Sequence, residues 1–303
     1  MDLQKLLILF MADNSKKKIV GLAISGGWIR AASAIGAVEV LLENGIEIDM
    51  VSGCSAGSVV ASAFAAGNLD KLKLRFLRGK LRDYLQVMFQ PTLPRDGFLK
   101  SEKTIEFWRE FVGDKSFSDL DKKLFLNATD LNTLSPVVLC EGKIAPAIQA
   151  CVNIPGMFVA FKHEDKILAD GGNFNLIPSK ILYDNGADYV IALDVSKGPN
   201  LVTRIIAGIK RIFGVNSGAD KFKSVKASRY PNIFVLVWRA LRVSSSQIHN
   251  FFSESYQFDI LIRPEIDGVK RWQIKKVDFL IKRGREASLK QIVKIKHDLG
   301  IWQ

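Results

Sequence analysis

Residues 53–57 read GCSAG, which places a serine between two glycines, each two positions away. The pattern G-x-S-x-G is typical of a sharp turn from a strand into a helix, in which glycine avoids clashes and the serine projects at the helix N-terminus. Backbone N–H groups and the helix dipole favour negative charge there. Ser55 is therefore a candidate nucleophile for ester hydrolysis. The pattern alone is weak, since about 0.1 chance matches are expected in a chain of this length.

The proton of Ser55 needs an acceptor, and the histidines are poor candidates. His163 is expected in a polar loop, FKHEDK, His249 follows a serine-rich segment, and His297 is expected in a basic C-terminal helix, so each is expected at the surface. Asp170 instead ends an apolar stretch, in KILADGG. Asp-Gly is also a common turn pair. Burial beside a serine would raise the pKa of a carboxyl from about 3.9 and make it a competent base.

A tetrahedral intermediate also needs hydrogen-bond donors for its negative oxygen. The loop SGGWIR, residues 25–30, follows the first predicted strand and opens a helix, so its backbone N–H groups could form this oxyanion hole. A phosphate cradle is the competing use, but the loop matches neither G-x-G-x-x-G nor G-x-x-x-x-G-K. A nucleotide-binding α/β protein is therefore the weakest of the candidate classes.

The elements that must position these residues alternate between strand and helix. Apolar runs at residues 19–24 and 48–53 predict buried strands, and alanine-rich runs at residues 31–45 and 55–67 predict the helices that follow them. This order is a βαβ unit and implies a parallel sheet. Further strands are predicted at 123–131, 135–142, 166–170 and 187–196, and further helices at 145–154, before Pro155, and at 279–300. Residues 19–303 are expected to form one α/β domain.

The composition is that of a globular protein, because 48% of the 303 residues are hydrophobic. The formal net charge of +12 favours anionic partners. No nucleic-acid-binding motif accompanies this charge. We therefore favour an anionic lipid surface over nucleic acid, with a plain solvated basic surface as an equal alternative. Nothing in the sequence indicates an oligomeric state.

Cysteine usage and the N-terminus bear on the compartment. Three cysteines without motif spacing argue against a disulfide framework or a zinc site and fit a reducing, cytoplasmic compartment. The apolar run near the N-terminus is too short to span a bilayer and lacks a cleavage site, so residues 1–18 are expected to be a short leader. Residues 201–213 project as a basic amphipathic helix, which either packs on the sheet, the favoured reading, or lies peripherally on a membrane.

Three motifs together resemble a known family. The loop SGGWIRAASAIG, the elbow GCSAG and the DGG of residues 170–172 follow the order typical of patatin-like phospholipases. More closely, the chain resembles the bacterial branch related to the catalytic domain of neuropathy target esterase, also in ATDLNT, IQACVNIPGMF, VIALDVS and DILIRP. The likeness runs from about residue 19 to the C-terminal helix. It implies a three-layer patatin-like fold with a mainly parallel central sheet flanked by helices.

The resemblance also implies site residues. Ser55 matches the nucleophile and Asp170 the general base of a Ser-Asp dyad that works without histidine. Gly26 and Gly27 match the oxyanion-loop glycines. Arg30 matches the loop arginine, which would order the loop or meet an anionic head group, unless it is a plain surface cation.

The loop departs from the family pattern at three positions. Trp28 stands where the family usually has a third glycine, Ala31 replaces the glycine after the arginine, and Ser25 stands where the family often has aspartate or glycine. The N–H of Trp28 can still donate, so Trp28 is kept as an oxyanion residue with the two glycines. Tryptophan restricts φ and fills space. We expect it to form a wall of the acyl pocket; the alternative is a distorted hole and low activity.

The expected function is a lipid acyl-ester hydrolase of the phospholipase or lysophospholipase type. The expected route passes through an acyl-serine and uses no metal or organic cofactor. The alternative is a catalytically weak or inactive protein of the same fold with a lipid-binding or regulatory role. The altered loop is what supports this alternative.

Overall fold

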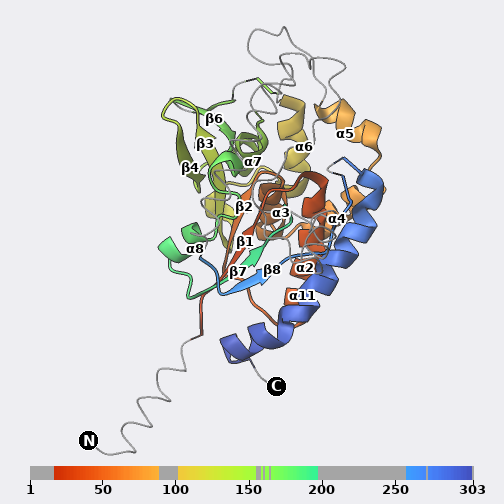
Figure 1. Cartoon of the computed structure of the whole chain (residues 1–303). Coiled ribbons are helices and arrows are strands. Elements are labelled where there is room, and N and C mark those ends of the chain that lie inside the picture. Colours follow the sequence, from red (N-terminus) through yellow and green to blue (C-terminus); the bar gives the residue numbers. More distant parts are fainter. Residues whose placement is uncertain are drawn as a thin grey trace, which may run out of the picture.

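The computed structural model describes residues 17–88, 102–154, 158–159, 161–163, 165–196, 257–270 and 272–301. Within these ranges eight strands form one sheet, with helices on both sides of it (Figure 1). The strands are β1 (Val20–Ile24), β2 (Met50–Cys54), β3 (Lys123–Asp130), β4 (Ser135–Leu139), β5 (Phe161–His163), β6 (Lys166–Asp170), β7 (Tyr189–Leu193) and β8 (Ile260–Ile262). The helices are α2 (Ala32–Glu43), α3 (Ala56–Ala65), α4 (Leu69–Arg78), α5 (Leu81–Met88), α6 (Glu102–Val112), α7 (Ile144–Val152), α8 (Lys180–Asp184) and α11 (Val277–Leu299).

The sheet is mixed and mostly parallel at its centre. Its strand order is β5-β6-β3-β2-β1-β7-β8, and β4 pairs with β3 beside this path. The neighbours from β3 through β2, β1 and β7 to β8 are parallel, whereas β4, β5 and β6 join antiparallel. The predicted fold class, a mainly parallel sheet flanked by helices, is confirmed.

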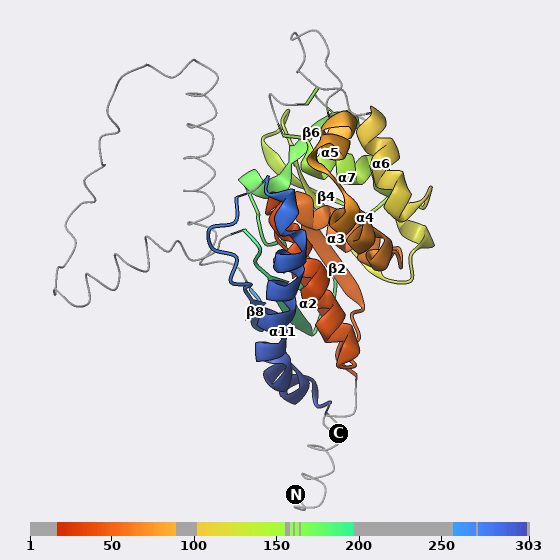
Figure 2. The ribbon, with the colours of Figure 1, turned by 90° about the vertical axis from the view of Figure 1, so that its right-hand side faces the viewer.

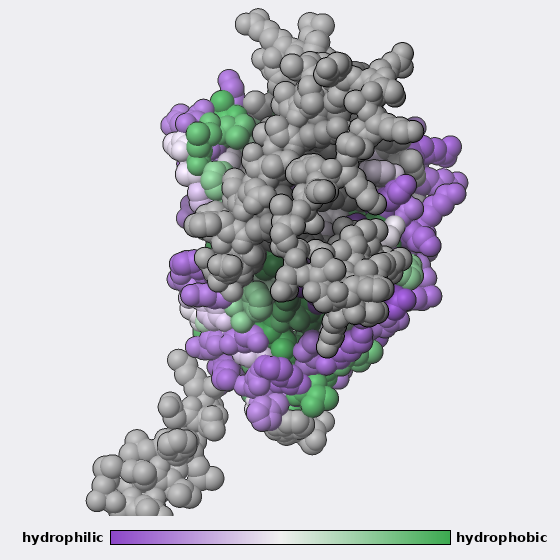
Figure 3. Space-filling model, viewed as in Figure 1, coloured by the Kyte–Doolittle hydropathy of each residue, from purple (hydrophilic) through white to green (hydrophobic). Residues whose placement is uncertain are grey.

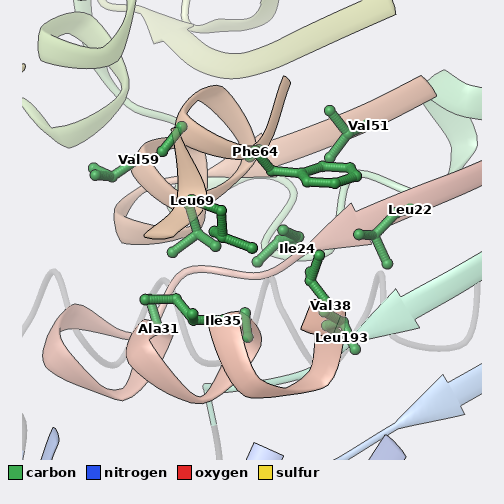
Figure 4. Packing of buried hydrophobic residues seen from close by; sticks show 14 of the residues in the cluster. Leu22, Ile24, Ala31, Ile35, Val38, Val51, Val59, Phe64, Leu69 and Leu193 are labelled. Carbon is green, nitrogen blue, oxygen red and sulfur yellow. The ribbon is translucent and has the colours of Figure 1, made fainter. Parts of the chain in front are cut away.

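Burial on both faces explains the apolar composition of the central strands. Every residue of β1, β2 and β7 is buried, as expected when helices cover both sides of a parallel sheet. The larger apolar cluster joins one face to α2, α3, α7 and α11, and Figure 4 shows part of this packing. A smaller cluster joins the other face to α8, which lies to the left of the sheet in Figure 1.

Two glycines allow the backbones of α2 and α11 to come into direct contact. A Cβ on Gly284 of α11 would come within 1.7 Å of the Ser33 carbonyl oxygen, and a Cβ on Gly36 of α2 within 2.1 Å of the Ile281 carbonyl oxygen. No side chain fits at either position. Figure 2 shows the two helices side by side in front of the sheet.

Most elements expected from the sequence are present, and the differences are at β5 and β8. Helix α7 ends at Val152, ahead of Pro155, as expected. The short strands β5 and β8 were not predicted, and the prediction that placed His163 in a loop was wrong, because this residue ends β5. The predicted amphipathic helix at 201–213 and residues 1–16 of the predicted leader lie outside the described residues.

None of the helices that the structure describes combines the length and the apolar character needed to cross a membrane.

Candidate active site

Ser55 lies on the sharp turn between β2 and α3. Its backbone has φ 52° and ψ −130°, a conformation that L-residues rarely adopt. The two flanking glycines permit this turn. A Cβ on Gly53 would lie 2.6 Å from the Ser58 Cα, and a Cβ on Gly57 would lie 2.5 Å from the carbonyl oxygens of Ile24 and Ser25. The G-x-S-x-G spacing thus has a direct steric cause in this fold.

The carboxylate of Asp170 accepts a hydrogen bond from the Ser55 hydroxyl. Ser55 Oγ donates to Asp170 Oδ2 over 2.6 Å, and the Gly172 N–H donates to Asp170 Oδ1 over 2.8 Å. Both carboxylate oxygens are therefore engaged, and one of them faces the serine directly. No histidine among the described residues takes part in this contact; the exposed His297, for example, contacts Asp298 on α11.

The sheet brings the serine and the aspartate together. Strand β4 pairs with β3 over residues 126–130, so β2 and β6 must share the other edge of β3. On that edge Cys54 is paired with Asn127, and Asp170 is paired with the next residue, Ala128. Strands β2 and β6 therefore meet end to end. The residue that follows β2, Ser55, must lie against the last residue of β6.

The surroundings of Asp170 change its acidity. Burial raises the pKa of Asp170 from its ordinary value of 3.8 to about 6, while the hydrogen bonds from Ser55 and Gly172 oppose this rise. A carboxylate with this pKa is still mostly ionised at neutral pH, and it is a stronger base than an exposed aspartate. The geometry and the acidity together suit Asp170 for accepting a proton from the serine.

Buried amides hold the aspartate turn in place. Asn127 of β3, which is 1% exposed, donates from Nδ2 to the Asn175 carbonyl over 2.7 Å and to the Gly171 carbonyl over 3.3 Å. The Asn153 carbonyl accepts the Asp170 N–H over 2.9 Å. Asn127 was not among the residues predicted from the sequence. Its signal was an amide directly after the apolar run of residues 124–126 in a predicted strand.

The loop after β1 lies directly against the serine. A Cβ on Gly26 would come within 2.8 Å of the Ser55 Cβ, so only glycine fits there. Ser25 anchors the start of the loop, since its N–H donates to the Leu193 carbonyl and its Oγ accepts the Val195 N–H over 2.8 Å. The sequence-predicted oxyanion loop and the nucleophile are therefore neighbours.

The backbone N–H groups of Gly26, Gly27 and Trp28 in this loop, and that of Ala56 directly after the serine, have no acceptor within the described part of the chain. Ala56 begins α3, so its N–H carries the positive end of the helix dipole. Ala56 was not among the residues predicted from the sequence, although the residue after the nucleophile of a G-x-S-x-G elbow commonly supplies an oxyanion donor.

The backbone of Trp28 adopts a left-handed conformation that is usual for glycine. Its φ is 55°, in the left-handed region that a bulky residue rarely occupies, and its side chain is 37% exposed. The third glycine of the family pattern would adopt this conformation without strain. The indole lies at the protein surface beside the loop, and a role as a wall of an acyl pocket stays a prediction.

Arg30 ties the loop to two other segments. Its guanidinium donates to the Val269 carbonyl from Nε over 2.9 Å and from NH2 over 2.6 Å, and to the Ser196 carbonyl over 3.0 Å. Of the roles considered for Arg30, ordering the loop agrees with these contacts. A plain surface cation does not, because the side chain is partly buried and fully engaged.

A second potential nucleophile, Cys54, precedes the serine. It is completely buried, and burial, followed by the nearby Asp170 carboxylate, raises the pKa of its thiol well above the ordinary value of 9.0. The thiol therefore stays protonated at neutral pH and does not compete with the hydroxyl.

Comparisons with known proteins agree with this geometry. Residues 22–189, more than half of the chain, match the family model described as patatin-like phospholipase. An uncharacterized NTE family protein of Mycobacterium tuberculosis is 29% identical over 177 residues, which cover 58% of this chain and 49% of the relative. A second one from the same organism is 24% identical over 281 residues, which cover 89% of this chain and 46% of the relative. The chain thus spans about half the length of these relatives.

Two further proteins are similar to this chain, one in sequence and one in structure. The neuropathy target esterase sws of Drosophila melanogaster is 25% identical over 181 residues, which cover 58% of this chain and 13% of that protein. The crystal structure of VipD from Legionella pneumophila superposes with a TM-score of 0.50 at 14% identity, covering 92% of this chain and 67% of that one, and so shares the fold. With its family model matched over the segment that holds the elbow and the aspartate, this chain belongs to the patatin-like phospholipase family.

Proposed function

We propose that the protein is a serine hydrolase of lipid acyl esters, of the phospholipase or lysophospholipase type, that works through a Ser55–Asp170 dyad. The observation that carries the proposal is the 2.6 Å hydrogen bond from Ser55 Oγ to a buried carboxylate whose pKa is raised to about 6. Membership of a phospholipase family supports the lipid ester as the substrate class.

In the acylation step Ser55 Oγ attacks the ester carbonyl carbon while its proton passes to Asp170 Oδ2. The carbonyl oxygen becomes an oxyanion, for which the free N–H groups of Gly26, Gly27, Trp28 and Ala56 are the available donors. The tetrahedral intermediate then collapses. The C–O bond to the leaving alcohol breaks, the alcohol takes the proton from Asp170, and an acyl-serine remains.

The second step returns the enzyme to its starting state. Asp170 takes a proton from water as the water oxygen attacks the acyl carbon. The second tetrahedral intermediate releases the fatty acid, and the proton returns to Ser55 Oγ. One carboxylate serves as base and acid in both steps, which requires a pKa close to the working pH.

An active-site label tests this proposal. We expect a fluorophosphonate probe to label the wild-type chain, and both Ser55→Ala and Asp170→Asn to lose the label. Ser62→Ala removes a buried hydroxyl from α3, the helix that follows Ser55, and is the matched control that keeps the label. A panel of acyl esters that differ in chain length and head group then identifies the substrate. A wild-type chain that is folded but neither labels nor hydrolyses any ester would refute the proposal.

One observation favours the alternative of a weakly active or inactive lipid-binding protein. Trp28 places a bulky residue at a φ of 55° within the loop that would hold the oxyanion. Labelling with little turnover in wild type, restored by Trp28→Gly, would indicate that the tryptophan impairs the hole. Turnover that does not change would indicate that its N–H donates normally.

A further inference from the structure

An exposed tryptophan surrounded by cations lies in the segment before α11. Residues 270–276 read KRWQIKK, and the Trp272 side chain is 67% exposed. Lys270, Lys275 and Lys276 are exposed as well. None of the three lysines forms an ion pair with a described residue: the neighbouring Asp278 pairs with Lys282, and Lys276 lies over the Phe279 ring at 5.6 Å. These cations have not been neutralised within the described protein.

This segment is fixed beside the active-site loop. The Arg30 side chain donates two hydrogen bonds to the Val269 carbonyl, the residue just before Lys270. Arg30 itself belongs to the short helix that follows Gly26 and Gly27. In Figure 2 the chain rises from β8 to the upper end of α11, so the segment lies at the end of the sheet where the parallel strands finish. Trp28, 37% exposed, stands on the same loop.

The opposite flank of the site also exposes apolar side chains. The β3–β4 hairpin extends two residues beyond Ala128, the partner of Asp170, and its turn exposes Leu131 (37%) and Leu134 (71%). Asp130 stiffens this turn by accepting hydrogen bonds from the Asn132 N–H and the Thr133 hydroxyl. Figure 3 shows hydrophobic residues gathered over the hairpin at the upper left.

The other end of the sheet differs in character. A cavity of about 500 Å³ opens there and is lined by acidic and basic residues together, among them Glu47, Asp49, Asp121 and Lys123. Lys17 forms an ion pair with Glu47 at this end. Among the described residues, lysines without an ion pair and an exposed tryptophan therefore occur together at the active-site end.

We propose that Lys270, Trp272, Lys275 and Lys276 form an anionic-lipid contact that seats the active-site end of the protein on a membrane or lipid-aggregate surface, with Trp272 entering the interface and the three lysines facing the head groups. Tryptophan prefers the boundary between head groups and acyl chains, and clustered lysines bind anionic leaflets. The serine then faces the lipid from which its substrate comes. This inference rests on the proposed lipid hydrolysis. The binding itself can be measured without catalysis.

Vesicle sedimentation with the inactive Ser55→Ala chain tests the contact. The vesicles contain either phosphatidylcholine alone or phosphatidylcholine with 30% phosphatidylglycerol, an arbitrary but roughly physiological anionic fraction. We expect binding to the anionic vesicles that weakens with added salt. Replacing the three lysines with glutamine removes roughly fivefold in partition coefficient per lysine, on the order of 100-fold in total. Trp272→Ala lowers binding on the order of tenfold to either kind of vesicle.

Matched controls lie at the other end of the sheet. Lys71, Lys122 and Lys123 changed together to glutamine lose the same charge, and Leu42→Ala removes an apolar side chain that is 46% exposed. Both controls should bind as the parent does, and thermal unfolding checks that every variant is folded. Equal binding by the 270/275/276 variant and its control, or no preference for anionic vesicles, would overturn the proposal. A folded wild-type chain that neither takes the probe at Ser55 nor hydrolyses any ester would instead refute the hydrolase function and leave the binding result standing.

Discussion

Replacing Asp170 with asparagine removes a buried charge that the native protein has to accommodate. The pKa of Asp170 is raised to about 6 in the folded protein, against 3.8 for an unperturbed aspartate. Above pH 6 the carboxyl is ionised in both the folded and the unfolded chain, and the folded chain bears the cost of burial. As the pH falls below 6, the folded carboxyl gains a proton before the unfolded one does. Wild-type stability from this group therefore rises as the pH falls from 6 to 3.8.

The two pKa values set the size of the effect. The raised pKa of Asp170 destabilises the folded chain by about 3 kcal/mol at pH 8, and about 1 kcal/mol of this destabilisation remains at pH 4.5. Asparagine carries no charge at either pH. The free energy of unfolding of Asp170→Asn relative to wild type should thus be about 2 kcal/mol higher at pH 8 than at pH 4.5. Any hydrogen bond weakened by the substitution enters at both pH values and cancels. For a chain of this size the melting temperatures shift by about 3 °C.

Thermal unfolding of both proteins at pH 4.5 and pH 8 measures this difference. The exposed Asp165, replaced by asparagine in the same way, is the control and should show no such change between the two pH values. The variant should also lose ester hydrolysis, so that it becomes more stable at pH 8 as it becomes inactive. A stability difference that is the same at both pH values, or larger at pH 4.5, would refute the view that Asp170 is a buried base with a raised pKa.

Four further predictions follow from the same geometry. The kcat/KM of wild type should rise with pH through about 6, because only ionised Asp170 accepts the serine proton; a flat profile between pH 5 and 7 would contradict this. Asn127→Ala should lower kcat on the order of tenfold with KM little changed, since it loosens the aspartate turn; steady-state kinetics measure it. Trp28→Gly should be more stable than Trp28→Ala by about 1 kcal/mol in denaturant titrations, because alanine keeps a Cβ at a positive φ. Gly284→Ala should destabilise the chain by more than about 3 kcal/mol, or prevent its soluble expression, because its Cβ would collide with backbone of α2.

Local chemistry allowed much of the fold to be predicted. The central strands could be recognised because they are buried on both faces and so read as continuous apolar runs. The helices after β1 and β2 could be recognised from alanine-rich runs that end at Asn44-Gly45 and Gly67. Strands β5 and β8 have only three residues each, too few to show a period, and they are strands because a neighbouring strand offers them an edge.

The positions that require glycine around Ser55 could be recognised in the sequence, whereas the backbone strain and the long-range contacts of the site could not. Gly53 and Gly57 could be recognised as part of a turn because the backbone around Ser55 leaves no room for side chains there, so the sequence has glycine at both positions. At Trp28 the sequence indicated only that a tryptophan occupies a position where the family usually has glycine, and the backbone of the folded chain was needed to show the positive φ. The contacts of Arg30 with Val269 were equally hidden, since the two residues are far apart in the chain.

By itself the sequence determined the strand–elbow–helix unit, the residue types of a candidate nucleophile and a candidate base, and the order of the motifs. The tertiary structure alone decided that the carboxylate reaches the serine hydroxyl. Ser55 and Asp170 stand 115 positions apart, and they touch because β2 and β6 occupy the same edge of β3 end to end. It also decided the acidity of Asp170, because the pKa of a carboxyl depends on how much water the assembled protein removes from it. Burial and strand register are properties of the packed chain, and no local stretch of sequence contains them.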